Sequence, residues 1–467
     1  MSPNPLAPAW LLEPDDVDAL DPSVWSHGAL RGDDGVVSVG GVPATDLVAR
    51  HGSPLYVVDE DDFRGRARGA KAAFDRELAR VGTSAVVYYA AKAFLSVEVA
   101  RWVAEAGLRV DICTGGEFAV AAAAGVEPAR MAFHGNNKSL AEIDRTVAAG
   151  IGNIVVDNAD EVVRVAEAAS RHGVVQSVRV RVNSGVHAST HDYLATARED
   201  QKFGITLADA PGVVAEIRRR PSLRFLGLHS HIGSQIFGSD GFGEAARRLL
   251  ALHAELLADG PVPELNLGGG FGIAYTSVDD ARPLDELAAA LADIVAAECA
   301  RLGIPIPVVA VEPGRVIAGP SGTTLYTVGT VKDVAVTVDE GTGETAVRRY
   351  VSVDGGMSDN ARPALYEADY SARVVSRASS TGPALSRVAG KHCESGDLVV
   401  LAEYLPDDVA PGDLLGVPAT GAYCWSLASN YNHVGRPPVV AVRDGASRVI
   451  VRGETEADLL ARDAGLD

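Results

Sequence analysis

The stretch AVVYYAAKAFLS, residues 85–96, joins a run of small and β-branched apolar residues to a lysine, Lys92. The apolar run predicts a buried strand, with Lys92 at its carboxyl end. Two interpretations of this lysine are open. Its ammonium group can reach solvent while its stem covers apolar surface, or it can be partly desolvated and attack a carbonyl carbon as an amine.

The pattern of this stretch repeats from residue 55 to residue 320: an apolar strand, a polar or glycine-rich stretch, then an amphipathic helix. If PLYVVD (54–59) is an outer strand, eight β/α units remain, which is the number in a (β/α)₈ barrel of the TIM type. The eight expected strands are AVVYYAAK (85–92), LRVDIC (108–113), MAFHGNN (131–137), NIVVDN (153–158), VRVRVN (178–183), FLGLHSHIGS (225–234), ELNLGGG (264–270) and VVAVEPG (308–314).

Polar residues stand near the carboxyl ends of successive expected strands. Those ends form one face of a barrel, where barrel enzymes carry their active sites. The residues that would converge there are Lys92, Asp111, His134, Asp157, Asn183, His231, the Gly268–Gly270 run and Glu312.

After residue 320 apolar and polar residues alternate between Gly, Pro and Asp turns, which predicts an antiparallel β domain. The N-terminal residues contain a short strand signal, GVVSVGG (35–41), that can join this domain. We therefore expect an N-terminal segment (1–54) joining the β domain, a barrel (55–320) and a C-terminal β-sandwich or β-barrel domain (321–467).

The composition excludes several classes of function. The formal net charge of −20 argues against nucleic acid or an anionic membrane as partner. The four cysteines are widely spaced, which indicates neither a disulfide framework nor a zinc ribbon. The N-terminus lacks the pattern of a signal peptide, and no apolar run is long enough to span a membrane, so a cytoplasmic protein is expected.

Two glycine-containing loops predict a phosphate site. NLGGGFG (266–272) would follow the seventh barrel strand, and EPGR (312–315) would follow the eighth. Backbone N–H groups in such loops approach an anion without a Cβ in the way, and these two loops are the usual phosphate cradle of a barrel. The alternative for the glycines is a tight turn without a ligand.

Glu312 stands at the end of an apolar strand, where a carboxylate has to be paired. Its partner is either Arg315, three residues later, or a protonated ring nitrogen of a cofactor. A phosphate cradle, the amine of Lys92 and a carboxylate facing a heterocycle together indicate pyridoxal phosphate (PLP). In that case Lys92 would form an imine with the aldehyde of the cofactor.

HSHIGSQ (229–235) places His229 and His231 on the same face of a strand. The pair is compatible with a metal site, with stacking of His231 on a cofactor ring, or with histidines of the core. Ser234 is within reach of a phosphate in the cofactor interpretation.

Three motifs of the β domain carry further candidates. In KHCESGD (391–397), Cys393 is either a small buried hydrophobe or a proton donor. MSDNARPALY (357–366) offers an arginine and a tyrosine that would recognise a carboxylate together, and GAYCWSLASNYN (421–432) offers further tyrosines. Each of these residues is also compatible with surface pairing of modest energy.

Taken together and in their order along the chain, these motifs resemble those of the diaminopimelate decarboxylase family. Members of this family are fold-type III PLP enzymes with an alanine racemase-like fold. The resemblance extends from about residue 50 to residue 450. It rests on YYAAKA (88–93), HGNNK (134–138), HSHIGSQ, NLGGGFG, EPGR, SVDGGMSDNARPALY (352–366), KHCESGD and GAYCWSLASNYN.

The resemblance implies a role for each matching residue. Lys92 resembles the Schiff-base lysine, His231 the residue stacked on the cofactor ring, and Cys393 the acid that protonates the carbanion. The implied cofactor contacts are Lys92, His231, Ser234, Gly270, Glu312, Gly314, Arg315 and Tyr423. The implied substrate contacts are Arg315, Arg362, Tyr366, Glu394 and Tyr423.

The implied reaction is that of a carboxy-lyase in lysine biosynthesis, which converts meso-diaminopimelate to L-lysine and CO₂ as the last step. In this family the active site is shared across a homodimer, and the loop with Cys393 and Glu394 comes from the partner chain. The resemblance implies no metal. Arginines at 315 and 362 with a glutamate at 394 complement a zwitterionic substrate end and reject analogues that lack it.

Three alternatives are weighed against this interpretation. A related decarboxylase of ornithine, arginine or carboxynorspermidine would not need Arg362 together with Glu394. A metal-dependent hydrolase would use His134, Asp157, His229 and His231, but it leaves the glycine cradle and EPGR unexplained. A non-catalytic PLP carrier would resemble the barrel alone. The presence of a β domain with Cys393 and Glu394 argues against this alternative.

Overall fold

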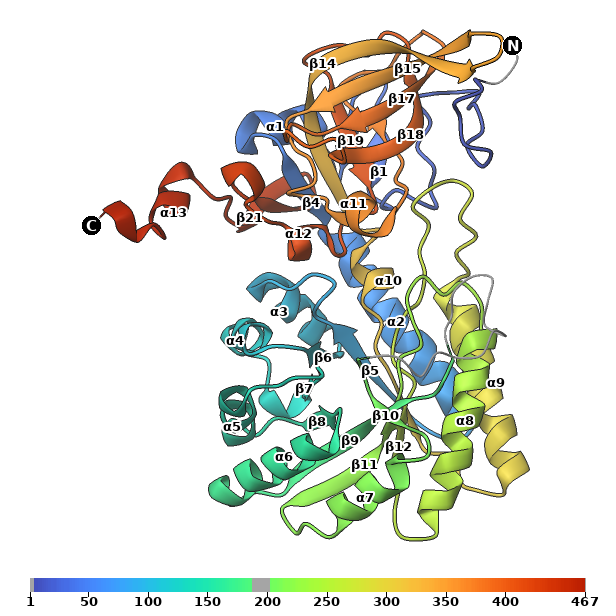
Figure 1. Cartoon of the computed structure of the whole chain (residues 1–467), viewed down its shortest axis with the longest axis vertical. Coiled ribbons are helices and arrows are strands. Elements are labelled where there is room, and N and C mark those ends of the chain that lie inside the picture. Colours follow the sequence, from blue (N-terminus) through green and yellow to red (C-terminus); the bar gives the residue numbers. More distant parts are fainter. Residues whose placement is uncertain (1–3, 187–201, 467) are drawn as a thin grey trace. The chain divides into compact units, whose positions relative to one another are not determined.

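The structure, a computed structural model, describes residues 4–186 and 202–466, and the chain divides into two compact units (Figure 1). The barrel unit comprises Arg64–Gly272 and Ala281–Ile317. The sheet unit comprises Met1–Phe63, Ile273–Asp280 and Ala318–Asp467. Within the described ranges, no helix combines the length and the apolar composition that crossing a membrane requires.

The barrel unit contains a closed ring of eight parallel strands, which confirms the predicted (β/α)₈ barrel. The ring closes because β13 pairs with β5 and β8 pairs with β9, and a short strand β10 (Ile205–Thr206) adds to β9. In ring order the strands are β5 (Ala85–Ala90), β6 (Arg109–Ile112), β7 (Met131–Phe133), β8 (Asn153–Val156), β9 (Gln176–Asn183), β11 (Leu223–His229), β12 (Glu264–Asn266) and β13 (Val308–Val311).

Helices follow the barrel strands, and one more helix precedes the first of these strands (Figure 1). Four successive helices begin with a side-chain cap, because Ser96, Thr114, Ser139 and Asn158 each accept a hydrogen bond from the helix backbone. These caps keep the strand-to-helix loops short, so residues at the strand ends stay at the mouth of the barrel. The helices are α2 (Glu60–Arg80), α3 (Val97–Glu105), α4 (Gly115–Ala123), α5 (Leu140–Ala148), α6 (Ala159–His172), α7 (Ala210–Arg218), α8 (Asp240–Leu257), α9 (Leu284–Leu302) and α10 (Arg315–Ala318).

A polar cluster inside the barrel lies at the amino ends of the strands. Arg179 is fully buried and its guanidinium donates to Glu264 (2.5 Å), Asn153 (3.0 Å) and the hydroxyl of Tyr88 (3.3 Å). A buried charge is tolerated when it is paired and fully hydrogen-bonded. Because barrel chemistry belongs to the opposite strand ends, this cluster serves stability.

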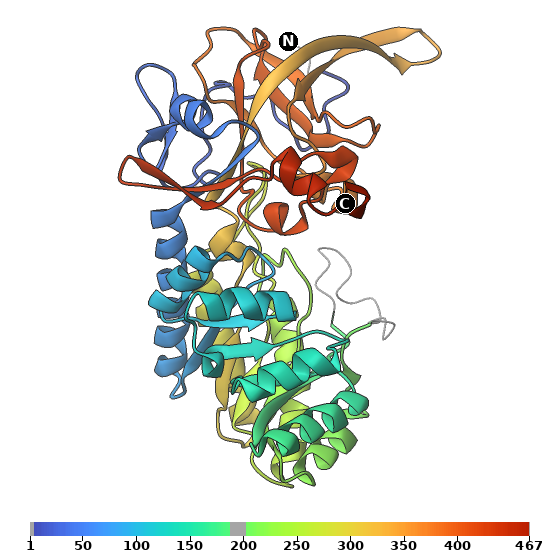
Figure 2. The ribbon, with the colours of Figure 1, turned by 90° about the vertical axis from the view of Figure 1, so that its left-hand side faces the viewer.

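The sheet unit is a mixed sheet with the strand order β18–β17–β15–β14–β4–β20–β21, and β19 joins β14 to β16. Its hairpin of β14 and β15 is long and twisted (Figure 2). The strands are β4 (Leu55–Asp59), β14 (Gly322–Asp339), β15 (Glu344–Val353), β16 (Arg373–Val374), β17 (Pro383–Ala389), β18 (Leu398–Pro406), β19 (Leu414–Pro418), β20 (Val439–Arg443) and β21 (Ala446–Val451). The helices are α1 (Ala44–His51), α11 (Arg362–Tyr366), α12 (Cys424–Leu427) and α13 (Glu456–Leu460).

Two strand pairs differ from the expected antiparallel arrangement. β15 pairs with β17 in parallel, and β4 pairs with β20 in parallel. Strands joined by a short turn become antiparallel, whereas these partners are far apart along the chain, which leaves both directions open. The sequence pattern identified the strands but not their directions.

The strand PLYVVD, which the sequence analysis placed at the start of the barrel segment, is part of the sheet unit. As β4, it pairs with β14 and β20. All five of its residues are buried. Continuous burial predicts a central strand without indicating which sheet contains it.

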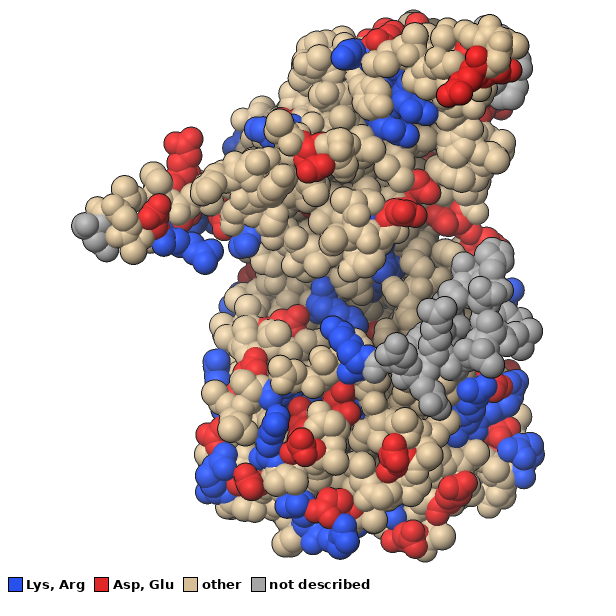
Figure 3. All heavy atoms as spheres, in the orientation of Figure 1, with Lys and Arg blue, Asp and Glu red and all other residues tan. Residues whose placement is uncertain are grey.

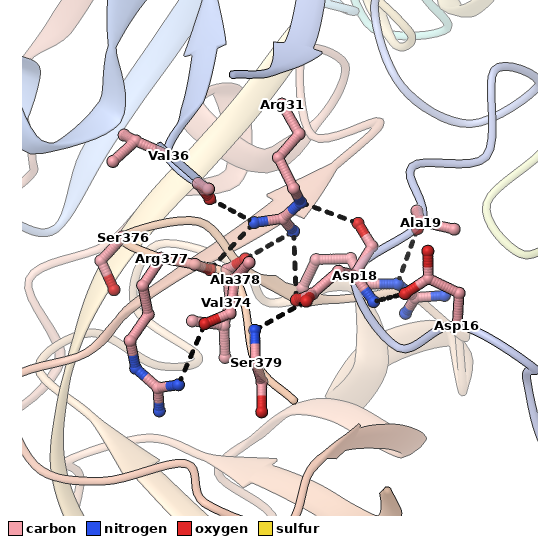
Figure 4. A network of polar contacts seen from close by, with 12 residues as sticks. Asp16, Asp18, Ala19, Arg31, Val36, Val374, Ser376, Arg377, Ala378 and Ser379 are labelled. Carbon is pink, nitrogen blue, oxygen red and sulfur yellow. Dashed lines mark hydrogen bonds and ion pairs between the residues drawn. The ribbon is translucent and has the colours of Figure 1, made fainter. Parts of the chain in front are cut away.

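The N-terminal strands β1 (Ala29–Arg31), β2 (Val37–Val39) and β3 (Val42–Pro43) form a separate three-stranded sheet within the sheet unit. Arg31 connects this sheet by hydrogen bonds to the end of β16 and to the segment that follows it (Figure 4). Its guanidinium donates to the carbonyl oxygens of Val374 and Arg377, both at 2.9 Å, and Asp18 accepts from the backbone of Ser379 at 2.7 Å. Backbone carbonyl groups that would otherwise lack partners are satisfied in this way.

Charges of both signs are interspersed on the face of the molecule shown in Figure 3. The net charge of −20 therefore does not form a single acidic field on this face. A local site can consequently attract an anionic ligand in spite of the net charge.

Candidate active site

A cavity of about 430 Å³ opens at the carboxyl ends of the barrel strands. Most of the residues that line it are polar, and they come from strand ends and loops that are far apart in sequence. Its lining comprises Lys92, Asp111, Cys113, His134, Gly135, Asn136, Arg181, Phe203, His229, His231, Ile232, Gly233 and Glu312. Of the strand-end residues singled out in the sequence, Lys92, Asp111, His134, His231 and Glu312 converge on this pocket, whereas Asp157, Asn183 and the Gly268–Gly270 run are not part of its lining.

Lys92 follows β5 by two residues and lines this cavity. The backbone around it is fixed, because Ala91 donates to the carbonyl of Asp111 (3.0 Å) and Ala90 donates to that of Pro313 (3.1 Å). The neighbouring alanines are buried, whereas the side chain of Lys92 is exposed within the chain. The amine is therefore accessible to a ligand in the cavity.

Glu312, directly after β13, is buried and surrounded by polar side chains. The amide of Asn266 donates to its Oε1 at 2.7 Å. The Nε2 atom of His229 lies 3.4 Å from Oε2, and that of His134 lies 3.3 Å from Oε1. A carboxylate in this position presents a fixed negative charge at the floor of the cavity.

Burial and neighbouring groups shift the pKa values of two carboxyl groups in this cavity, Glu312 and Asp111. Burial raises the pKa of Glu312, but the imidazoles of His134 and His229 outweigh this effect and hold that pKa well below its ordinary value. Burial and the charge of Glu312 raise the pKa of Asp111 well above its ordinary value. Glu312 is therefore ionised at neutral pH, and its charge makes the protonated form of Asp111 more favourable than it is for an exposed carboxyl group.

His231 lies on the loop after β11, where the N–H of Gly269 donates to its Nδ1 at 3.4 Å. Burial lowers the pKa of His231 to about 3, and the positive charge of Lys92 adds to this effect. A neutral imidazole ring suits stacking on a flat ligand.

The metal interpretation is only partly compatible with the geometry. His134, His229 and Glu312 offer ligand atoms within 4.8 Å of one another. His231 and Asp157 are not members of this group, and the carboxylate of Asp157 lies 3.9 Å from Arg181. Of the two histidines of HSHIGSQ, His229 therefore belongs to the group of possible metal ligands and His231 does not.

The glycines after β12 allow three loops to approach closely. A Cβ on Gly269 would lie 2.1 Å from the carbonyl oxygen of Glu312, and one on Gly270 would lie 2.5 Å from that of Gly233. Gly268 and Gly270 also have positive φ angles, of 71° and 114°, which glycine adopts without strain. The loops after β11, β12 and β13 thus form a cradle that only glycine permits.

Two side chains complete this cradle. The guanidinium of the buried Arg315 donates to the hydroxyl of Ser234 at 2.8 Å. Gly314 precedes this arginine, and a Cβ there would lie 2.9 Å from the Cβ of Ala90. A hydroxyl and a guanidinium hydrogen-bonded to each other beside a glycine-rich loop match a phosphate group.

The other predicted site residues lie on helix α11 and on two loops of the sheet unit. Arg362 is buried at the start of α11, whereas Tyr366 at its end is 65% exposed. Tyr423, directly before α12, has a positive φ of 67°. Arg362, Tyr366 and Tyr423 all belong to the sheet unit.

Cys393 and Glu394 lie on the loop between β17 and β18, and Cys393 is an exposed free thiol. The base of the loop is fixed by the carboxylate of Asp397, which accepts from the backbone of His392 (2.7 Å) and of Met357 (2.6 Å). The His392 ring in turn is hydrogen-bonded to Ser358 at 2.8 Å. An ordered base with an exposed tip presents the thiol to a ligand or a partner.

Two residues of the cavity region were not predicted from the sequence. Arg181 on β9 lines the cavity and stacks over the ring of Phe203 at 4.2 Å. Asn266 at the end of β12 orients Glu312. The alternation VRVRVN was a usable signal for the arginine, because residues i and i+2 of a strand share a face.

Comparison with known proteins identifies the class of this fold and site. Residues 64–319 match the family described as pyridoxal-dependent decarboxylase, pyridoxal binding domain. This match covers more than half of the chain, so the protein is a PLP-dependent decarboxylase.

Curated relatives and solved structures narrow this class. The chain is 52% identical to the diaminopimelate decarboxylase of Mycobacterium tuberculosis, over 95% of this chain and 98% of that protein. It is 41% identical to that of Bacillus subtilis, over 94% and 97%. The crystal structure of the M. jannaschii enzyme superposes with a TM-score of 0.86, at 30% identity over 94% and 98% of the two chains. The chain belongs to the diaminopimelate decarboxylase family.

Proposed function

We propose that this protein converts meso-2,6-diaminopimelate to L-lysine and CO₂, the last step of lysine biosynthesis, and that it does so in the cytoplasm. The observation that carries the proposal is the cavity at the barrel strand ends. It places an accessible amine, Lys92, in the same pocket as a buried and ionised carboxylate, Glu312. Family membership supports the choice of substrate.

The residues of the barrel unit fit PLP. Lys92 would bind its aldehyde carbon covalently, Glu312 would hold the proton on its ring nitrogen, and His231 would pack against its ring. Ser234, Gly270, Gly314 and Arg315 would hold its phosphate. From the sheet unit, Tyr423 is proposed as a contact of both cofactor and substrate. Bound in this way, PLP supplies a cationic ring that accepts the electron pair left behind when CO₂ departs.

The residues of the chain have separate tasks in the reaction. Glu312 keeps its negative charge in a site with little water, where it stabilises an adjacent cation more strongly than it would in solvent. Cys393 returns a proton to the carbon that lost CO₂. Its exposed thiol on an ordered loop supports this assignment.

The proposed substrate has a second amino-acid end that does not react. Arg315 and Arg362 would bind its carboxylate, Glu394 would bind its ammonium group, and Tyr366 would contact the same end. Because Arg362 is buried, a ligand without this carboxylate would leave a desolvated guanidinium without the anionic partner that the ligand supplies. Such a pocket favours diaminopimelate over ornithine or arginine.

The direct test supplies meso-diaminopimelate to the purified, PLP-loaded protein. We expect CO₂ and L-lysine in equal amounts, measured by gas release and by amino-acid chromatography. Turnover of ornithine or arginine at comparable rates, with none of diaminopimelate, would assign the protein to the alternative decarboxylases.

Replacing Cys393 by Ala is expected to lower kcat by about 10²-fold or more, because the proton then has to come from water. The absorbance of bound PLP should stay unchanged, since the thiol does not hold the cofactor. The matched control is Cys299→Ala, which removes a buried thiol on α9 outside the cavity lining. Turnover like that of the unmodified protein would remove Cys393 from the reaction.

We further propose a homodimer in which the second copy supplies Cys393 and Glu394. Exposed apolar side chains of the sheet unit support this, because Leu365 on α11 is 59% exposed and Tyr431 is 41% exposed. Mixing the inactive Lys92→Ala and Cys393→Ala variants should restore about a quarter of the full activity, because half of the dimers gain one intact site. Exchange of subunits without any recovery would place both residues of a site in one chain.

Replacing Arg362 by Ala is expected to raise KM for meso-diaminopimelate by about 10- to 100-fold, the usual value of a charge-assisted hydrogen bond to a carboxylate. Steady-state kinetics over a wide range of substrate concentration measures this change. Arg452→Ala, which removes a 70%-exposed arginine side chain of the same unit, is the control and should leave KM unchanged. An unaltered KM in the Arg362 variant would move the carboxylate site elsewhere.

A further inference from the structure

Four buried residues of the sheet unit form a closed ring of hydrogen bonds around the proposed substrate arginine. The guanidinium of Arg362 donates to the hydroxyl of Tyr370 at 2.5 Å, and this hydroxyl lies 3.6 Å from the sulfur of Cys424. The thiol of Cys424 donates to Oδ1 of Asn360 at 3.5 Å. The backbone N–H of Arg362 donates to the same oxygen at 3.4 Å, which closes the ring.

The directions of these bonds are mutually consistent. Burial raises the pKa of Tyr370 well above its ordinary value, so its hydroxyl keeps its proton. Because that oxygen accepts from Arg362, its own proton is available to the sulfur of Cys424. All four side chains are at most 5% exposed, so water does not compete for these positions.

Aromatic rings fix the same guanidinium from its faces. Its central carbon lies 4.5 Å from the ring centre of Tyr275 and 5.5 Å from that of Tyr370. The two rings meet edge to face, with centroids 5.0 Å apart. Tyr275 is held by its own backbone, because its carbonyl accepts from Ser371 at 3.2 Å.

We propose that Tyr370 is a positioning residue for Arg362, and that it sets the preference of the protein for ligands with a distal carboxylate. The inference rests on the proposed function, in which Arg362 binds that carboxylate. An arginine side chain has many rotamers, and holding it in one before the ligand arrives lowers the entropy lost on binding. One donor of the guanidinium is occupied by Tyr370, which leaves the remaining N–H groups of its fork for a carboxylate.

The test compares two ligands that differ by a single carboxylate. L-lysine carries it and cadaverine lacks it. Calorimetric titration of the PLP-loaded protein measures the Kd of each. In Tyr370→Phe, we expect lysine to bind about 5- to 10-fold more weakly, which is less than the effect of losing a direct hydrogen bond to a charged group because Tyr370 acts through Arg362, and cadaverine to bind within about twofold of normal.

The matched control is Tyr326→Phe. Tyr326 is a fully buried tyrosine of the same unit, and its hydroxyl has no hydrogen-bond partner among the described residues. The control should leave both affinities unchanged. Equal losses for lysine and cadaverine in Tyr370→Phe, or an unchanged lysine affinity, would overturn the proposal, since a general structural disturbance does not distinguish the two ligands.

Two further variants keep the test decisive. In an Arg362→Ala background, Tyr370→Phe should have no additional effect on lysine binding, because the group that it positions is gone. If Tyr370→Phe does not fold, Tyr275→Leu removes the ring above the guanidinium and should weaken lysine selectively by about threefold. Wild-type protein that binds lysine over cadaverine but releases no CO₂ from meso-diaminopimelate would contradict the proposed function alone.

Discussion

Replacing Lys92 by Ala is expected to abolish covalent attachment of PLP and to lower kcat by more than about 10³-fold. Lys92 lines the cavity, and its exposed amine is the group available to the aldehyde of the cofactor. The fold should survive, because the backbone of this turn is fixed by bonds from Ala90 and Ala91 rather than by the lysine side chain. Melting temperatures within a few degrees of each other would confirm this.

Borohydride reduction followed by peptide mapping measures the attachment directly. In the unmodified protein the adduct should be found on the peptide that contains Lys92, and in the variant it should be absent. Lys332→Ala is the control, since Lys332 is an exposed lysine on β14. An adduct on another lysine, or full turnover by the Lys92 variant, would assign the nucleophile to a different residue.

The barrel was predictable because its signals are local. Most of the strands are buried apolar runs, and each of the first four helices that follow carries its own N-terminal cap. Closure of the ring then makes the first and eighth strands neighbours, with Val87 opposite Val311. Lys92 and Glu312 could therefore be placed near each other from the strand count alone.

Which strands pair with each other in the sheet unit was not predictable from the same signals. β4 is as apolar as a barrel strand, and its partners β14 and β20 lie hundreds of residues further along the chain. Alternation shows which face of a strand is buried but not which strand lies beside it. The parallel pairs and the separate N-terminal sheet followed from such distant partners.

The same limit applies to the side chains that support the site. The motifs indicated Glu312 and Arg362, but not Asn266, which orients the first, nor Tyr370, which holds the second. These partners lie on other loops, and their role depends on distances that only the fold provides. Motifs therefore predicted the groups that would touch a ligand, and the structure was needed for the groups that act through them.

Replacing Glu312 by Gln is expected to lower kcat by about 10²- to 10³-fold, in the range found when a preorganised electrostatic group is removed. The amide has the shape of the carboxylate and can still bond to Asn266, but it has no charge with which to hold a proton on the cofactor ring. The neighbouring imidazoles keep the pKa of Glu312 well below its ordinary value, so the charge that is lost is present at neutral pH.

PLP content should stay near one per chain in this variant, because the phosphate cradle around Gly270 and Arg315 does not include the carboxylate. The measurement is kcat together with the absorbance spectrum of the bound cofactor. Glu298→Gln, which makes the same chemical change on α9 where Glu298 pairs with Arg301, should leave both unchanged. A Glu312 variant with normal turnover would mean that the ring nitrogen needs no anionic partner, and the electronic role assigned to the floor of the cavity would then be wrong.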